Sequence, residues 1–269
     1  MSGVAVIVDL DKCVGCRACQ VACQSWNGRE ALITEFTPDF TNPPDLHANS
    51  WKVVKFIEYK YKKTLRLDGT TITREDYGWT GVPINCMHCV DPPCSRICPA
   101  RAITVSPEGA VVIDKNKCIG CKFCGLACPF NVPRYGKDGK AYKCTFCVDR
   151  LQAGMVPSCV AHCPAGVFTL TTLEEAREIA KDLEAKGKVV YGFSLGSYVG
   201  DSVRWIFTIS KEKADQVLPK VFPEKPVNIN VVKETLESVA PPIFGLAGLA
   251  IVAGLALAWW RASRVGEKK

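Results

Sequence analysis

The chain has 269 residues, of which 48% are hydrophobic, so it is long enough to bury a core without cross-links. Its formal net charge of +7 does not by itself indicate nucleic-acid binding. The most basic stretch, residues 52–66, mixes its charges with β-branched and aromatic residues, as on a strand with a solvated face, and no nucleic-acid-binding motif accompanies it. We therefore expect no nucleic-acid partner.

The chain begins with an expected strand and a group of four cysteines. The first ten residues contain acidic Asp9 and no basic residue, so no secretory signal is expected there. Residues 4–8 are apolar and predict a strand that leads into the cysteines. This first group has the spacing C-x2-C-x2-C-x3-C and consists of Cys13, Cys16, Cys19 and Cys23.

An insertion, residues 29–81, separates the first two cysteine groups. It contains a predicted β-hairpin whose strands are residues 51–67 and 70–74. The expected turn is Asp68–Gly69, because an Asp-Gly pair between two strand-like runs is a strong hairpin signal.

Three further groups of four cysteines follow, beside short apolar runs. The third group repeats the spacing of the first, the second widens one gap to four residues, and the fourth has eleven residues in its middle gap. The apolar runs at residues 102–105, 110–113 and 167–170 predict strands. The groups are Cys86, Cys89, Cys94 and Cys98; Cys118, Cys121, Cys124 and Cys128; and Cys144, Cys147, Cys159 and Cys163.

A helix and two strands are expected after the fourth group. The segment from Thr172 to Glu175 has the form of a capping box, which opens a helix that ends near Gly187. Strand-like runs follow at residues 189–193 and 203–209.

The carboxyl-terminal region predicts a membrane anchor. Residues 238–260 carry no charge and are long enough to cross a bilayer, so they predict a transmembrane helix. A basic tail follows at residues 261–269. A buried hydrophobic helix is the alternative interpretation of the apolar segment.

The cysteine spacings predict four [4Fe–4S] clusters. Such a cluster needs four converging thiolates, and in two-cluster ferredoxins the last cysteine of each run ligates the other cluster. The two outer groups and the two inner groups then each form an interlocked pair, which uses all sixteen cysteines. We assign cluster one to Cys13, Cys16, Cys19 and Cys163, cluster two to Cys23, Cys144, Cys147 and Cys159, cluster three to Cys98, Cys118, Cys121 and Cys124, and cluster four to Cys86, Cys89, Cys94 and Cys128.

Zinc sites and disulfides are the alternatives to iron–sulfur clusters. C-x2-C pairs do bind zinc, but a third cysteine after two residues and a fourth after three fit a zinc ribbon poorly. His88 and His162 lie inside cysteine groups and could replace a ligand, although each expected cluster already has four cysteines. Proline follows the last cysteine of every group except the first, where Gln24 stands, so Cys23 departs from the motif.

The predicted fold class is α+β, with two ferredoxin-like double-cluster units, an inserted hairpin and one carboxyl-terminal transmembrane helix. No dinucleotide fingerprint, phosphate loop or pair of catalytic carboxylates stands out, so we expect no catalytic site. The four-cluster domain is residues 1–237. Within it, the outer cluster pair comes from residues 1–28 and 141–171, the inner pair from residues 82–135, and the carboxyl-terminal extension is residues 172–237.

The four-group arrangement, the sequence KCTFCVDRLQAGMVPSCVAHCPAG and the single carboxyl-terminal span resemble the iron–sulfur (beta) subunit of membrane-bound formate dehydrogenases. The cysteine motifs are shared with a wider set of four-cluster subunits that serve molybdenum or tungsten pterin enzymes, and with some hydrogenase subunits. The helix from residue 172, the VYGFSLG stretch and the final span resemble the formate dehydrogenase version.

This resemblance implies an electron-transfer subunit without a catalytic site of its own. Its partners would be a molybdenum or tungsten pterin subunit that oxidises formate and a membrane cytochrome b, or other quinone-reactive subunit, that reduces quinone. In that family, cluster one lies nearest the catalytic subunit and cluster three nearest the membrane. The alternatives are the same subunit in a dimethyl sulfoxide-type or other sulfur-compound reductase or in a hydrogenase, and a zinc-stabilised membrane adaptor without a redox role.

The expected location is the cell membrane, crossed once. Four basic residues follow the expected span and two lie in the residues before it, so the positive-inside rule places the tail in the cytoplasm and the cluster domain outside. The resemblance implies a route for this export, since the family's beta subunits cross the membrane folded and bound to a catalytic subunit that carries a twin-arginine signal. A cluster domain in the cytoplasm is the alternative.

Overall fold

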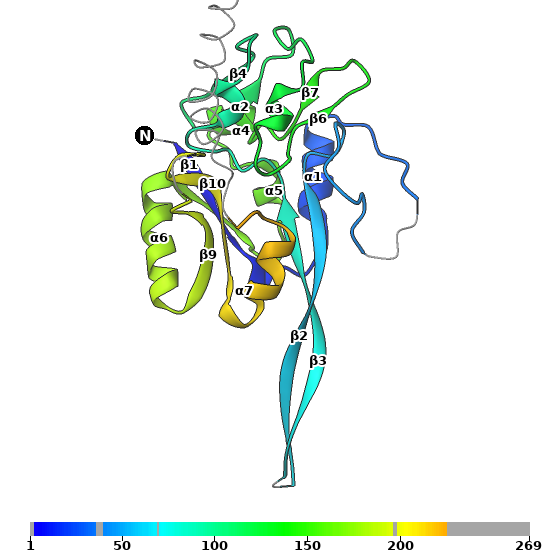
Figure 1. Cartoon of the computed structure of the whole chain (residues 1–269), viewed down its shortest axis with the longest axis vertical. Coiled ribbons are helices and arrows are strands. Elements are labelled where there is room, and N and C mark those ends of the chain that lie inside the picture. The colour runs from blue at the N-terminus through cyan, green and yellow to red at the C-terminus, as the bar shows by residue number, and fades with distance from the viewer. Residues whose placement is uncertain (1–2, 36–39, 69, 196–197, 225–269) are drawn as a thin grey trace, which may run out of the picture. The chain divides into compact units, whose positions relative to one another are not determined.

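The structure is a computed structural model that describes residues 3–35, 40–68, 70–195 and 198–224 (Figure 1). The expected transmembrane segment 238–260, the basic tail 261–269 and the end of the extension, residues 225–237, lie outside the described residues. Among the residues that are described, no helix is both long and apolar enough to cross a membrane.

A four-stranded sheet forms the main core, in the strand order β8-β1-β10-β9. β1 pairs antiparallel with β8 and parallel with β10, and β10 pairs antiparallel with β9. The four apolar runs predicted to be strands here are confirmed, with ends that differ by one or two residues. The strands are β1 (Val4–Asp9), β8 (Phe168–Thr172), β9 (Lys188–Phe193) and β10 (Ser202–Ser210).

Helix α6 (Leu173–Ala185) covers one face of this sheet (Figure 1). The expected capping box is present, because Thr172 Oγ1 accepts a hydrogen bond from Glu175 N at 3.2 Å and the Glu175 carboxylate accepts one from Thr172 N at 3.3 Å. Ala176 and Ala180, one turn apart, pack against the sheet. Their small side chains let the helix lie close to the strands.

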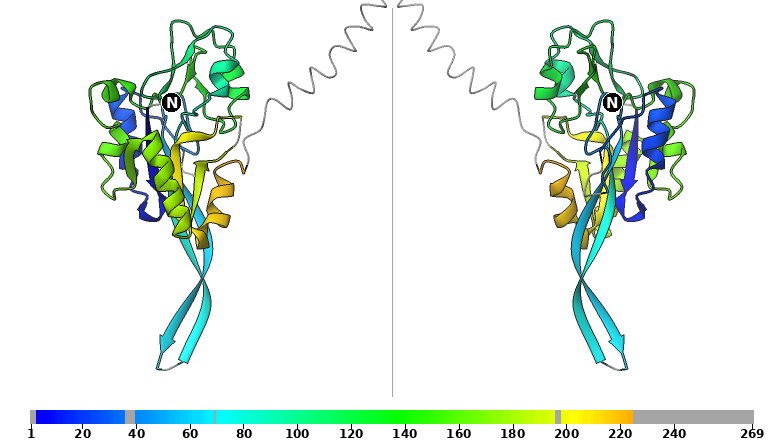
Figure 2. Two further views of the ribbon diagram at one scale, coloured as in Figure 1. Left: turned by 90° about the vertical axis from the view of Figure 1, so that its left-hand side faces the viewer. Right: turned by 90° about the vertical axis from the view of Figure 1, so that its right-hand side faces the viewer.

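The insertion contains a long β-hairpin of β2 (Val53–Leu67) and β3 (Thr70–Ile84), and its outer half extends away from the sheet and helices (Figure 2). The turn lies where the Asp-Gly pair predicts it, since Leu67 pairs with Thr70. The predicted end of the second strand at residue 74 is wrong, because β3 continues to its base at Ile84. Glycines interrupt the strand pattern there, but the base is buried and the ladder continues to it.

Helix α7 (Lys211–Val217) fixes the inner half of the hairpin. The Gln216 side chain accepts a hydrogen bond from Lys60 N at 2.9 Å and donates one to Lys60 O at 2.8 Å, as a neighbouring strand would. Lys220 Nζ donates to Glu58 O at 2.9 Å. The edge of β2 is thus covered as far as Lys60.

Two short antiparallel ladders lie beside the inner cysteine groups. β4 (Ile103–Val105) pairs with β5 (Val111–Ile113), as the apolar runs predict. β6 (Arg134–Tyr135) pairs with β7 (Ala141–Tyr142), and strands of two residues are too short to show a periodicity in the sequence. The β4–β5 ladder joins the second group to the third, as the β1–β8 ladder joins the first to the fourth.

The remaining helices are short and lie within or beside the cysteine groups. Four-residue helices end before the last cysteine of the second, third and fourth groups, whereas the last two cysteines of the first group lie on a longer helix. These helices are α1 (Ala18–Trp26), α2 (Pro93–Arg96), α3 (Phe123–Leu126), α4 (Val148–Gln152) and α5 (Ser158–Ala161).

Candidate iron–sulfur cluster sites

Two cavities in the inner half of the chain are each lined by four cysteines, three from one group and one from the other. Each has an empty volume of about 350 Å³. One is lined by Cys98, Cys118, Cys121 and Cys124, the set assigned to cluster three. The other is lined by Cys86, Cys89, Cys94 and Cys128, the set assigned to cluster four.

The first of two outer sets gathers around Cys19. Burial, with the neighbouring Cys159, Cys13 and Cys163, raises the pKa of the Cys19 thiol to about 12. Burial also raises the pKa of Cys13, whose neighbours include Cys163 and Cys16. The four cysteines assigned to cluster one are thus electrostatic neighbours.

The second outer set gathers around Cys144, which is fully buried. Burial and the neighbouring Cys23, Cys147, Cys86 and Cys159 raise the pKa of this thiol well above its ordinary value. Three of these neighbours are the residues assigned with Cys144 to cluster two. Cys23 joins them although its sequence departs from the motif.

These raised pKa values mean that the buried thiols favour the protonated form when iron is not bound. A buried thiol without a cation beside it keeps its proton, whereas iron binds the thiolate. Burial raises the pKa of Cys94 to about 12 and that of Cys128 to about 11, so the inner sites behave as the outer ones do. Iron binding must therefore displace protons from most of these cysteines.

The first C-x2-C loop of each cysteine group has the same backbone turn. The residue directly before the second cysteine is left-handed in each loop, which turns successive backbone amides inward and forms a concave site for an anionic group. Two of these residues are glycine, and the other two are strained because they carry side chains. The residues are Gly15 (φ +63°), His88 (φ +47°), Gly120 (φ +73°) and Phe146 (φ +61°).

The two side chains at these strained positions stack on each other. The rings of His88 and Phe146 lie 4.7 Å apart at 22°. Phe146 also contacts Trp205 of β10, with 5.7 Å between ring centroids. The loop of the second group and that of the fourth group therefore meet through an aromatic contact.

The last cysteine of each group accepts a hydrogen bond from the residue four positions later. In three groups the donor is a backbone amide: Ala102 N to Cys98 Sγ at 3.3 Å, Val132 N to Cys128 Sγ at 3.4 Å and Val167 N to Cys163 Sγ at 3.4 Å. In the first group no proline follows Cys23 and helix α1 continues, so the Asn27 amide N bonds to Cys23 O instead. The donor to Cys23 Sγ is therefore the Asn27 side chain, whose Nδ2 lies 3.8 Å from the sulfur.

Electrostatic interactions between cysteines of different sets link the four sites one to the next. Cys19 of set one neighbours Cys159 of set two, and Cys86 of set four is among the neighbours that raise the pKa of Cys144 in set two. Burial raises the pKa of Cys94 in set four, and its neighbours include Cys124 of set three. The order along the chain of sites is one, two, four, three.

The two histidines inside the cysteine groups both interact with backbone atoms. His88 is fully buried, and its Nδ1 accepts a hydrogen bond from Val111 N at 2.9 Å. Burial, with the charges of Lys143 and Arg204, lowers the pKa of His88 well below 6.5, so its ring is neutral. His162 Nδ1 lies 2.9 Å from Ser158 O, within helix α5.

Two buried lysines beside the cysteines were not predicted from the sequence. Residues 52–66 were expected to have a solvated face, but Lys52 is only 1% exposed. Lys143 is also buried, lines the cavity of set four, and donates hydrogen bonds to Val111 O and Cys144 O. No feature of the local pattern distinguishes Lys52 from the exposed lysines further along the hairpin.

The two inner cysteine sets line cavities, as described above. Within the described part of the chain, no three His, Cys, Asp or Glu side chains are close enough to hold a single metal ion.

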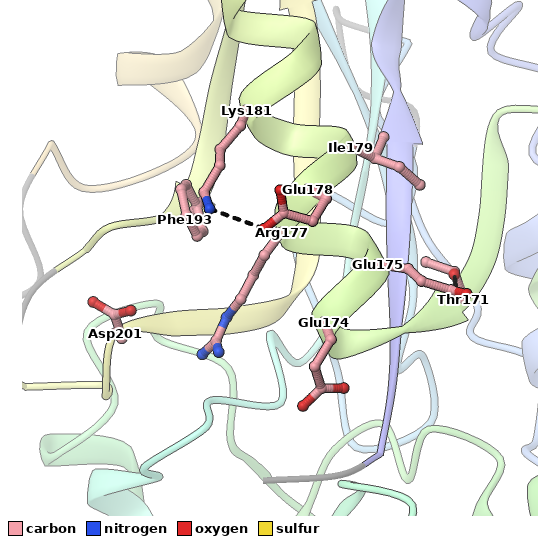
Figure 3. Close-up of a pocket in the computed structure, with 9 residues that line it drawn as sticks. All are labelled: Thr171, Glu174, Glu175, Arg177, Glu178, Ile179, Lys181, Phe193 and Asp201. Carbon is pink, nitrogen blue, oxygen red and sulfur yellow. Dashed lines mark hydrogen bonds and ion pairs between the residues drawn. The ribbon is translucent and has the colours of Figure 1, made fainter.

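A separate open hollow on the surface of α6 is lined by charged and apolar residues and by no cysteine (Figure 3). In it Lys181 pairs with Glu178 at 2.9 Å.

Two protein families match the regions that hold these sets. Residues 77–173 match the 4Fe-4S dicluster domain, and residues 4–25 match a 4Fe-4S binding domain. The formate dehydrogenase iron–sulfur subunit of Haemophilus influenzae is 35% identical over 259 residues, which cover 93% of this chain and 79% of that subunit. The chain belongs to the family of formate dehydrogenase iron–sulfur subunits. It binds four [4Fe–4S] clusters, the number that sixteen cysteines in ferredoxin-like motifs can hold.

Other members of this family and a hydrogenase-related protein match a shorter region. The iron–sulfur subunit of the nitrate-inducible formate dehydrogenase of Escherichia coli K12 is 41% identical over 187 residues, 69% of this chain. The match spans only 60% of the length of that subunit. The hydrogenase-2 operon protein HybA of Escherichia coli O157:H7 is 35% identical over 188 residues, 66% of this chain and 54% of its own length.

Proposed function

We propose that this chain is the electron-transfer subunit of a formate dehydrogenase complex. It would carry electrons from a molybdenum or tungsten pterin catalytic subunit, along its four clusters, to a membrane cytochrome b and the quinone pool. Each [4Fe–4S] cluster supplies one-electron transfer at a potential set by its protein surroundings. The chain has no substrate site of its own in this proposal. The residues proposed to hold each cluster are the four cysteine sets described above.

The exposure of the cysteines is the observation that carries this proposal. All sixteen lie in the described residues, and the two that are exposed are Cys16 of set one and Cys121 of set three. These sets are the two ends of the row. A row of sites whose two exposed cysteines lie in the end sets suits a protein that receives electrons from one partner and delivers them to another.

Exposed apolar side chains lie near both exposed cysteines in the sequence, as expected for docking surfaces. Val14 and Val21, in the segment that contains Cys16, are 59% and 62% exposed. Ile119 and Leu126 are 70% and 82% exposed in the segment that contains Cys121. We assign the end at set one to the catalytic subunit and the end at set three to the membrane partner, as the family resemblance implies.

A formate reduction experiment tests the proposal. The complex should be purified intact, its iron measured, and its clusters examined by electron paramagnetic resonance (EPR) after formate is added. About 16 Fe per chain and reduction of the clusters by formate are expected. Abundant zinc with little iron would refute the electron-transfer role. Reduction by hydrogen but not by formate would favour the hydrogenase-type complex that the similarity to HybA suggests.

We propose that residues 238–260 anchor the chain in the cell membrane and that the cluster domain lies on the outer side. The charge bias across that segment supports this orientation. Trypsin added to cells stripped of their outer layers should cut the exposed hairpin at Lys62 or Lys63. Protection in such cells, with cleavage only in inverted membrane vesicles, would show the opposite orientation.

A further inference from the structure

Lys52 is a buried lysine with no acidic partner. It lies directly before β2, and its side chain is 1% exposed. Nζ donates a hydrogen bond to Asn85 Oδ1 at 2.7 Å, and Asn85 Nδ2 in turn donates to Cys86 O at 2.7 Å. Among the residues that the structure describes, no carboxylate forms an ion pair with Nζ. Burying an ammonium group without a counter-charge is strongly unfavourable.

Two aromatic rings hold this ammonium group in place. Nζ lies 4.2 Å from the ring centroid of Trp205 and 4.8 Å from that of Phe168. Both rings are buried, and they meet edge to face with 5.8 Å between centroids. Cation–π contacts and one amide hydrogen bond fix the position of the charge, but they do not neutralise it.

The groups that can neutralise this charge are the outer cysteines. Burial disfavours the charged form of Lys52, and Cys159, Cys19, Cys144 and Cys23 favour that form when they are thiolates, as they are when they bind iron. Cys19 belongs to set one and the other three belong to set two. Lys52 is thus close to the ligands of two sites at once.

We propose that Lys52 is the shared counter-ion of clusters one and two, and that its fixed positive charge raises the reduction potentials of both. A [4Fe–4S] cluster with four thiolates carries about −2, and reduction adds one more negative charge. A buried cation stabilises the reduced form more than the oxidised form, and the low local dielectric makes this effect large. The inference rests on the proposed cluster ligands, but it holds for any electron donor or acceptor.

The test is a redox titration of the intact complex, poised with chemical mediators and followed by EPR. Lys52→Met removes the charge and keeps a long apolar side chain, whereas Lys52→Arg keeps the charge. Lys181→Met, on the exposed surface of α6, is the matched control. We expect Lys52→Met to lower the potentials of two of the four clusters, and Lys52→Arg and Lys181→Met to leave all four near those of the unmodified complex.

Asn85→Asp tests the same idea with Lys52 in place. A carboxylate at the position of Asn85 Oδ1 would neutralise the ammonium group, so the potentials of clusters one and two should again fall. If the Lys52→Met complex fails to assemble, the potentials of the Asn85→Asp complex test the proposal instead. Unchanged potentials in the variant that assembles, or an equal shift of all four clusters, would overturn the proposal. Because no formate or quinone is used, a wrong assignment of the complex would not affect this result.

Discussion

Gly81 lies directly against Cys13. A Cβ at Gly81 would come 2.8 Å from Cys13 Sγ and 3.2 Å from Gly15 Cα, closer than real Cβ atoms approach such a sulfur. Gly81 is on β3, near the base of the hairpin. The base of the inserted hairpin therefore forms a wall of the site for cluster one.

This contact predicts that Gly81→Ala selectively removes cluster one. The added methyl group would push the Cys13 loop out of position, and a ligand displaced by this distance cannot bind. The purified variant should contain about 12 Fe per chain in place of about 16, with one EPR signal lost.

Gly78→Ala, three residues earlier on the same strand, is the control for this prediction. Its Cβ would meet the far end of the Tyr59 side chain, which can move. Full iron content in Gly81→Ala, or equal losses in both variants, would show that the hairpin base does not shape the site.

Asn27→Ala should lower the reduction potential of cluster two. Asn27 Nδ2 is the donor to Cys23 Sγ, and hydrogen bonds to cluster sulfurs stabilise the reduced state. Redox titration measures the shift. Gln24→Ala is the control, because Gln24 lies on the same helix and donates to Glu30 O at 2.9 Å. A shift of equal size in both variants would assign the effect to the helix and not to the hydrogen bond.

Cys121→Ser should separate two activities of the complex. Serine is a poorer iron ligand, so cluster three would be weakened or altered in potential. Reduction of quinone by formate should fall, while reduction of an artificial dye by the catalytic subunit continues. Cys16→Ser at the other end of the row should instead slow every transfer that passes through this chain. Equal loss of dye and quinone activity in Cys121→Ser would contradict the order of the sites.

The stability contribution of Asp11 should disappear only in strong acid. Burial raises the pKa of this carboxyl, but hydrogen bonds from Lys213 and Ser210 and the charge of Lys188 outweigh burial and hold it below the ordinary value of 3.8. The folded state therefore favours the ionised form. The resulting stability is present above about pH 4 and is lost as the pH falls through the lowered pKa.

Asp11→Asn tests this pH dependence. The partly exposed site should contribute about 1 kcal/mol to the free energy of unfolding. The difference in thermal stability between the two proteins should be constant from pH 7 to pH 5 and shrink only below pH 4. A difference that already shrinks between pH 7 and pH 5 would indicate another titrating group.

Periodicity and spacing predicted the parts of the fold that are local in sequence. The capping box at Thr172, the hairpin turn beside Asp68 and the strands next to the cysteine groups are short-range patterns, and each is confirmed. The assignment of cysteines to sets used the repeated spacing and stays a prediction, and the two inner sets each line one cavity. The full length of β3 could not be predicted, because pairing with β2 continues a ladder through glycines that local propensity disfavours.

Features that depend on distant residues were not visible in the sequence. Lys52 resembles the other lysines of the hairpin strand, and its burial depends on Trp205 and Phe168, which lie more than a hundred residues away. The role of Asn27 follows from the continuation of helix α1 past Cys23. The missing proline after Cys23 was the available signal, but it indicated only a departure from the motif.

The position of β1 sets an order for assembly. β1 ends at Asp9, but its two hydrogen-bonding neighbours are β8 and β10, which end at Thr172 and Ser210. When the first cysteine group leaves the ribosome, the sheet that will support it has not yet been synthesised. The inner groups depend on the local β4–β5 ladder and can reach their native arrangement much earlier. Delivery of iron and sulfide to the inner pair can thus begin on a growing chain, whereas completion of the outer pair must wait until nearly the whole domain has been translated.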